Sequence, residues 1–251
     1  MEKLTAIIPT FNEEHNIVEA IKSVDFADEI IVVDSFSTDK TVELATPLAT
    51  KVIKREYINS ASQKNWAIPQ AQHSWILLLD ADERVTPELK LEVVDKLKEN
   101  PAESGFWIYR INHFMGKRIN FSGWRGDKVI RLFKRDECKY EALHVHAEII
   151  SDGKIGFLNH KLHHNTYVST EVFEKKMVRY AKWQAKDYDG KTGVITPYHT
   201  LIKPLARFFK HFVIQFGFLD GYVGFIIAHS QACAVSKRYK FLRELRANRE
   251  N

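Results

Sequence analysis

The chain has 251 residues, of which 45% are hydrophobic and 27% are charged, and this excludes both a disordered chain and a bundle of membrane spans. The length suits one large domain, or one domain with an appendage. The formal net charge of +5 is concentrated in residues 201–251, which hold nine Lys and Arg against three Asp and Glu. Two cysteines do not suggest a disulfide framework, and the first residues lack a secretory pattern, so we expect a cytoplasmic protein.

Short apolar runs alternate with helical patterns over the first 100 residues. These runs predict strands at 4–9, 29–35, 51–56 and 75–80. Apolar residues at helical spacing or turn chemistry predict helices in the segments 12–24, 37–49, 60–71 and 86–100. The second helix is expected to begin at Ser37 or Thr38, the third is disturbed by Pro69, and the fourth has Thr86 as its N-cap before Pro87. Strands of this kind predict a parallel sheet covered by helices on both sides.

After residue 100 the pattern changes to further strands joined by glycine-containing segments, and from residue 170 it becomes helical. We therefore predict an α/β fold with a Rossmann-like, mostly parallel mixed sheet flanked by helices, and a C-terminal helical extension. In parallel sheets, ligands bind at the carboxyl ends of the strands. The four predicted strand ends carry polar residues, among them Thr10 with Glu13, Asp34, Glu56, and Asp80 with Asp82. Loop polarity alone would explain one or two such ends but not carboxylates at all four.

The turn after the first strand, PTFNEE, contains no glycine. A dinucleotide-binding Rossmann fold would need a glycine-rich turn there, and a P-loop is also absent from the sequence. A sugar nucleotidyltransferase would be expected to have a glycine-rich, basic loop at the same place. The acidic strand ends instead indicate a nucleotide bound through its base and ribose, with its diphosphate held through a metal.

The segment WILLLDADE places three carboxylates directly after a buried run. Asp80 and Asp82, two residues apart on a strand, would point to the same face and could approach one cation, either both directly or one through water. Oxygen ligands suit Mg²⁺ or Mn²⁺, and a cation relieves the repulsion between the carboxylates. The alternative is an acidic turn that favours the next helix, which fits Glu83 but not Asp80.

Four segments together resemble a known family. IIPTFNEEHNI, IIVVDSFSTDKT, SQKNWAI and WILLLDADERVTPEL are similar, in order and spacing, to the motifs of family 2 glycosyltransferases, which have the GT-A fold. Later segments such as GWRGDKVIRLFKR resemble the branch of lipopolysaccharide core β-glycosyltransferases. The resemblance covers roughly residues 4–167. It implies an inverting enzyme that moves a sugar from a nucleotide diphosphate donor to a glycolipid, lipopolysaccharide or polysaccharide acceptor.

The resemblance also implies domains and a donor site. Residues 1–168 would form the GT-A catalytic domain, with a nucleotide-sugar-binding half at 1–100 and an acceptor-side half at 101–168, followed by a helical, basic region at 169–251. Asp80 and Asp82 match the D-x-D motif that binds Mg²⁺ or Mn²⁺ in the family. The residues expected at the nucleotide are Pro9, Thr10, Glu13, Asp34, Lys64, Asn65 and Asp80.

An inverting transfer also needs a general base for the acceptor hydroxyl. Asp127, in a glycine-flanked loop, matches an acidic position of the branch and is the expected base, whereas an Asp that only pairs with Arg125 or Lys128 is the alternative. The other candidates are Glu141, Glu148 and His146. Glu148 stands one residue later than the glutamate of the branch, and such a slip turns a strand side chain to the opposite face.

Four residues are expected to contact the acceptor or a phosphate: Trp124, Arg125, Arg131 and His146. Trp124 can stack on a sugar ring, and Arg131 can receive a phosphate, although a solvated strand face is the alternative for the basic segment. His164 is a further histidine that can touch phosphate or metal. A structural zinc site is not expected, because no cysteine pair or H-E-x-x-H motif accompanies the histidines.

The C-terminal region combines apolar residues at helical spacing with Lys203, Arg207 and Lys210 on the other side. Its longest uncharged stretch, 221–236, has 16 residues, fewer than the ~20 that a membrane span needs. We expect an amphipathic helix that lies on the inner face of the cytoplasmic membrane, with packing on the catalytic domain or at a dimer contact as the alternative. Nucleic acid is not an expected partner, because no binding motif accompanies the charge.

Two other functions stay open on the sequence. One is a sugar nucleotidyltransferase on a similar sheet, against which the missing glycine-rich loop argues. The other is a non-catalytic protein of the membrane surface that binds a nucleotide sugar.

Overall fold

The computed structural model describes residues 2–141, 148–167 and 169–250. By its internal contacts the chain forms two compact units. Unit 1 contains Met1–Ile111 and Asp127–His164, and unit 2 contains Asn112–Gly126 and Asn165–Asn251. In this division the segment 112–126, predicted as part of the acceptor-side half, groups with the C-terminal helices.

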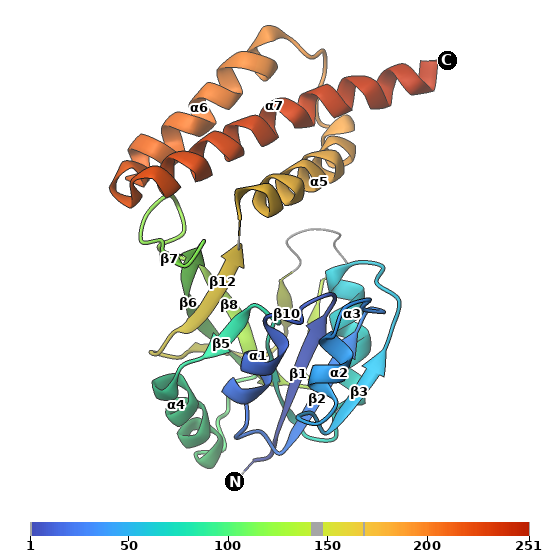
Figure 1. Ribbon diagram of the computed structural model, residues 1–251, viewed down its shortest axis with the longest axis vertical. Coiled ribbons are helices and arrows are strands. Elements are labelled where there is room, and N and C mark those ends of the chain that lie inside the picture. Colours follow the sequence, from blue (N-terminus) through green and yellow to red (C-terminus); the bar gives the residue numbers. More distant parts are fainter. Residues whose placement is uncertain (1, 142–147, 168, 251) are drawn as a thin grey trace. The chain divides into compact units, whose positions relative to one another are not determined.

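Unit 1 is an α/β assembly (Figure 1). Its elements are β1 (Leu4–Thr10), α1 (Ile17–Ser23), β2 (Glu29–Asp34), α2 (Thr41–Ala45), β3 (Lys51–Lys54), α3 (Ser60–Ala67), η1 (Ile68–Gln70), β4 (Trp75–Leu78), β5 (Glu83–Val85), α4 (Pro87–Lys98), β8 (Lys128–Lys134), β9 (Cys138–Tyr140), β10 (Ile149–Ser151) and β11 (Ile155–Phe157). Two strands, β6 (Gly105–Phe114) and β12 (Leu162–Tyr167), begin in unit 1 and end in unit 2.

The main sheet of the described residues follows the strand order β3-β2-β1-β4-β8-β6-β12-β5. β1 pairs in parallel with β2 and β4, and β2 with β3, whereas β8 runs antiparallel to β4 and β6. The parallel part consists of the short apolar strands that helical crossovers connect. The predicted α/β fold, with a mixed sheet flanked by helices and a C-terminal helical region, is confirmed.

Both faces of β1 are buried, because its side chains alternate between two apolar clusters. Ala6 and Ile8 pack in one cluster with residues of α1, α2 and α4, and Ile7 packs in the other with residues of α3. All residues of β2 are buried as well. Helices therefore hold both faces of the parallel strands, which leaves the carboxyl ends of these strands to carry functional loops.

The local sequence predicted the first residue of α4 correctly but not that of α2. Thr86 caps α4, and its hydroxyl accepts a hydrogen bond from Leu89 N at 3.2 Å, as predicted. By contrast, α2 begins only at Thr41 and not at Ser37 or Thr38. The backbone N–H of Ser37 donates to the nearby carboxylate of Asp34, and that of Thr38 donates to Asn12 Oδ1 in the loop after β1, so both residues belong to a loop that is held partly by a tertiary contact.

Unit 2 is mainly helical. Its elements are β7 (Lys117–Arg118), α5 (Thr170–Asp189), the π-helical turn η2 (Tyr198–Ile202), α6 (Lys203–Phe209), the π-helical turn η3 (Lys210–Ile214), η4 (Gly217–Asp220) and α7 (Tyr222–Glu250). Phe114, Phe173 and Ile227 are among the residues that form its core. Among the helices of the described residues, we find none that combines the length and the hydropathy of a membrane span.

Candidate active site

The carboxyl ends of β1 and β2 bring together several residues predicted to bind the nucleotide. Thr10 and Asp34 are paired in the sheet, and Asp34 is fully buried with its carboxylate accepting from Ser37 N at 3.1 Å. Glu13 N donates to Thr41 Oγ1 at 2.7 Å, which holds the loop after β1 in place. Thr10 Oγ1 is buried without a hydrogen-bond partner among the described residues. Such a group is satisfied when a ligand or water reaches it.

The segment from Asp80 to Glu83 is a turn. β4 ends at Leu78, and Glu83 N donates to Asp80 O at 2.9 Å. The expectation that Asp80 and Asp82 share one face of a strand is therefore wrong. The turn directs Asp80 toward two cations and places Asp82 beside His164.

Asp80 lies between Lys64 of α3 and Arg131 of β8. Its Oδ1 is 2.9 Å from Lys64 Nζ, and its Oδ2 accepts a short hydrogen bond from Arg131 Nη2. Burial by itself would raise the pKa of Asp80, but the charges of Arg131 and Lys64 outweigh it and hold this pKa far below its ordinary value. Asp80 is therefore ionised at neutral pH, and protein cations occupy both of its oxygens.

Glu83 extends this contact into a buried chain of charges. Its fully buried carboxylate accepts from Arg131 Nε at 2.9 Å and Nη2 at 2.8 Å, and from Arg110 Nη1 at 3.2 Å. Arg110 in turn holds Asp127 by two hydrogen bonds of 2.9 and 2.8 Å. We call this chain, from Lys64 through Asp80, Arg131, Glu83 and Arg110 to Asp127, the ion network. Glu83 begins β5 and not the next helix, so the prediction that it serves only a helix dipole is wrong.

Asp82 and His164 form a second polar pair. Asp82 Oδ2 lies 3.6 Å from His164 Nε2, where β5 and β12 pair. Burial raises the pKa of Glu13 and the charge of Asp82 raises it further, so these two carboxylates are close enough to repel. The described residues hold no group of three or more His, Cys, Asp or Glu that could enclose a metal. A carboxylate and an imidazole still supply two ligands, and Mg²⁺ or Mn²⁺ can fill the rest with water and phosphate oxygens.

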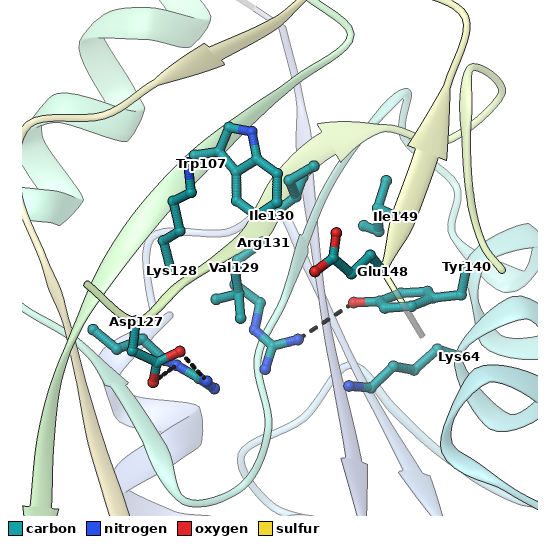
Figure 2. Close-up of a pocket in the computed structure, with 11 residues that line it drawn as sticks. Lys64, Trp107, Asp127, Lys128, Val129, Ile130, Arg131, Tyr140, Glu148 and Ile149 are labelled. Atoms are coloured by element: carbon teal, nitrogen blue, oxygen red, sulfur yellow. Dashed lines mark hydrogen bonds and ion pairs between the residues drawn. The ribbon is translucent and has the colours of Figure 1, made fainter. Parts of the chain in front are cut away.

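A pocket of about 260 Å³ adjoins the ion network within unit 1 (Figure 2). The residues that line it are Lys64, Trp107, Arg110, Asp127, Lys128, Val129, Ile130, Arg131, Tyr140, Glu148 and Ile149. Asp127 and Glu148 bring two carboxylates to its wall. Glu148 thus reaches the pocket although its place in the sequence is one residue late. Lys128 Nζ lies 4.6 Å from the ring centroid of Trp107, which gives the wall an aromatic and a cationic part.

Asn65 and Arg131, both predicted to contact a ligand, also bind other residues of unit 1. The side-chain amide of Asn65 donates to Tyr140 O at 2.9 Å and accepts from Tyr140 N at 2.8 Å, which fastens α3 to β9. Arg131, expected at the acceptor, is only 3% exposed and forms the centre of the ion network. Neither arrangement tests the predicted ligand contacts, which stay predictions.

Other predicted residues lie elsewhere in the chain. Trp124 and Arg125 belong to unit 2, where Trp124 packs against Phe114 with ring centroids 6.3 Å apart and Arg125 is exposed. Glu141 N donates to the carbonyl oxygen of residue 148 at 3.0 Å. His146 lies outside the described residues.

Arg110 is a residue of the site that the sequence reading missed. From Phe106 onward its strand, β6, buries only residues at even positions, namely Phe106, Ile108, Asn112 and Phe114. An arginine at position 110 of this alternation falls on the buried face, and a buried guanidinium needs a carboxylate partner. The strand pattern therefore carried a signal for an acid near this position.

Comparisons with known proteins identify the family of this chain. The model of "Glycosyl transferase family 2" matches residues 5–149. A Rickettsia felis protein named as an uncharacterized glycosyltransferase is 30% identical over 259 residues, which cover 97% of this chain and 90% of that protein. The lipopolysaccharide core biosynthesis glycosyltransferase LpsC of Rhizobium meliloti is 25% identical over 252 residues, covering 94% and 93%.

Solved structures show weaker likeness. TarS 1–349 of Staphylococcus aureus in complex with UDP has a TM-score of 0.47 and 15% identity, covering 98% of this chain and 92% of that one. Glucosyl-3-phosphoglycerate synthase of Mycobacterium tuberculosis, solved with Mn²⁺ and UDP, has a TM-score of 0.38 and 21% identity, covering 45% and 44%. The family match by itself spans more than half of the chain, including the turn of Asp80 and the loop of Asp127. The chain therefore belongs to glycosyl transferase family 2, and it is a glycosyltransferase.

Proposed function

We propose that this enzyme is an inverting, divalent-metal-dependent glycosyltransferase that uses a nucleoside diphosphate sugar. The observation that carries the proposal is the ion network, which joins the turn of Asp80 to Asp127 and borders one pocket. A donor diphosphate near this turn and an acceptor hydroxyl near Asp127 would then lie at opposite ends of a sugar in the pocket. The pocket is smaller than the ~300–1,000 Å³ of sites for drug-sized ligands, and its volume suits a single sugar ring.

We propose Asp82 and His164 as the protein ligands of Mg²⁺ or Mn²⁺. Asp80 is proposed to reach the cation only through water, because Lys64 and Arg131 already occupy both of its oxygens. A bound cation would neutralise charge on the leaving diphosphate. Lys64 and Arg131 both line the pocket and both contact Asp80, and these cations would add to this neutralisation.

The remaining roles fall to the strand ends and the pocket wall. Pro9, Thr10, Glu13 and Asp34 are proposed to hold the base and ribose. Asp127 is proposed as the general base, oriented by the two hydrogen bonds from Arg110. Glu148 is the second candidate, since it lines the same pocket and makes no ion pair with any described residue.

The acceptor is proposed to be a glycolipid, lipopolysaccharide or polysaccharide. The similarity to LpsC, which extends over nearly the whole chain, supports this class. Trp124, Arg125 and His146 are each proposed as residues that contact it.

A thermal-shift screen of nucleotide sugars, with and without Mn²⁺, tests the donor and the metal together. A ligand that binds the native state at about 100 times its Kd adds about 2.7 kcal/mol of stability, a rise in Tm of roughly 5–10 °C. Asp82→Asn should abolish the part of the shift that depends on Mn²⁺. Asp25→Asn, at an exposed carboxylate in unit 1, is the matched control and should retain it. An unchanged Mn²⁺-dependent shift in Asp82→Asn would refute the metal assignment.

A further inference from the structure

Unit 2 exposes a concentration of large apolar side chains in residues 198–225. About half of the exposed large hydrophobic residues of the described chain lie in this short segment. Among them, Leu205 is 66% exposed, Leu219 57% and Tyr222 76%. We call these exposed side chains the apolar surface of unit 2. A concentration of this kind marks an interaction site, because scattered single residues are the norm on a soluble surface.

The helical part of this surface, on α6, has apolar residues on its exposed side. Leu205 and Phe209 are four residues apart on α6, so they lie on one stripe of the helix, and both are exposed. Phe208 and Phe212 are half-buried and pack against Phe225 on α7, with ring centroids 5.9 and 6.1 Å from that of Phe225. A helix at an ordinary protein surface would carry polar residues on its outer stripe. Here the inner and outer stripes are both apolar.

The turn between η3 and α7 extends the apolar surface as a fixed tip. Phe216 adopts a φ of 55°, in the left-handed region that a bulky residue rarely occupies, and Phe216 and Leu219 are both exposed. Asp220 fastens the turn, since its carboxylate accepts from Asn120 N at 3.0 Å and from Ser122 Oγ at 2.7 Å. Strain of this kind persists only where the surroundings hold it, and it clusters at functional sites.

Within residues 198–225 the charged side chains are basic, with one exception that is buried. The cations of the apolar surface are Arg207, Lys210 and Lys203, whose Nζ also donates to Tyr239 Oη at 2.9 Å, and Asp220 is the only acid in residues 198–225. Asp220 is 3% exposed and hydrogen-bonded, so it presents no negative charge to a partner. Apposition of two copies of this surface would bring like charges together, which disfavours self-association.

We propose that the apolar surface docks on an anionic lipid bilayer. α6 would lie in the plane of the interface, with its outer stripe and the tip at 216–219 among the acyl chains and its lysines and arginine at the headgroups. The proposal is independent of the donor and the metal, and donor binding in the thermal-shift assay can fail or succeed without affecting it.

Co-sedimentation of the full chain with vesicles tests the proposal. The wild-type protein should bind vesicles of phosphatidylcholine with about one third phosphatidylglycerol, and this binding should weaken as salt is added. The double variant Leu205→Glu/Phe209→Glu should lower the partition coefficient by about 100-fold, roughly tenfold for each side chain withdrawn from the acyl region. Lys210→Glu should weaken binding to the anionic vesicles while leaving binding to pure phosphatidylcholine unchanged.

Leu91→Glu is the matched control, because Leu91 is 65% exposed on α4 of unit 1, and this variant should bind like wild type. Circular dichroism and Tm establish that the variants are folded. The proposal is overturned if the folded wild-type chain does not sediment with the anionic vesicles. It is also overturned if the double variant sediments with the vesicles like wild type. A third contrary result is a wild-type dimer in ultracentrifugation that the double variant abolishes, with no vesicle binding by the wild-type chain.

Discussion

Replacing Glu83 by glutamine should destabilise the enzyme more than any exposed charge change. The carboxylate is fully buried and accepts three hydrogen bonds from two guanidinium groups, and a fourth from the backbone N–H of Asp80 at 3.0 Å. Glutamine keeps the shape but removes the charge, and its amide N–H₂ would face the N–H groups of Arg131 or Arg110. The ion network, which holds three cations and three carboxylates, would then carry an uncompensated positive charge.

The magnitude follows from the burial of the partners. Arg131 is 3% exposed, and the side chain of Arg110 is 16% exposed, so water cannot replace the lost carboxylate. Breaking a buried pair in this way costs about 3–5 kcal/mol. For a chain of this size such a loss corresponds to a fall in Tm of roughly 6–20 °C.

Thermal unfolding followed by circular dichroism measures this loss. Glu88→Gln is the matched control, because Glu88 is exposed in the first turn of α4 and its change should stay within about 0.5 kcal/mol. The double variant Glu83→Gln/Arg131→Met should recover part of the stability, since it removes the unpaired cation together with the acid. A Tm of Glu83→Gln equal to that of Glu88→Gln would refute the view that the network supports the site.

Three further outcomes are expected. Asp127→Asn should lower kcat by about 10²–10⁴-fold, and the donor should still raise the Tm of this variant. If Asp127→Asn is instead fully active and Glu148→Gln shows this loss, Glu148 is the base. Burial lowers the pKa of His211, so the unfolded chain binds more protons between its pKa of about 6.5 and the lower folded value. Stability should therefore fall as the pH drops through this window, and His211→Gln should flatten the dependence in pH-resolved melts. Gly224→Ala should destabilise unit 2 by about 1–3 kcal/mol in urea unfolding, because its Cβ would lie 1.8 Å from a backbone oxygen of the preceding turn, whereas Gly190→Ala has open space and should be neutral.

The sequence alone predicted the fold class and the edge of the sheet that carries the site. Strand and helix patterns are properties of consecutive residues, so the apolar run at 75–78 and the N-cap Thr86 before Pro87 could be read without the fold. The carboxyl ends of parallel strands meet at one edge in any such sheet, which is why Thr10 and Asp34 were expected near each other.

The tertiary structure alone decided how the carboxylates divide their roles. The sequence shows Asp80, Asp82 and Glu83 as neighbours, but a turn sends them to partners that are far away in the chain. Arg131 lies 51 residues from Asp80, and Arg110 lies 27 residues from Glu83. The alternation of β6 marks Arg110 as a buried cation but does not identify its partner, because the pairings arise only when β8 pairs with β4 and β6 pairs with β8. The physical reason is that a buried charge must find its counter-charge in space, and the position of that counter-charge along the chain is not constrained.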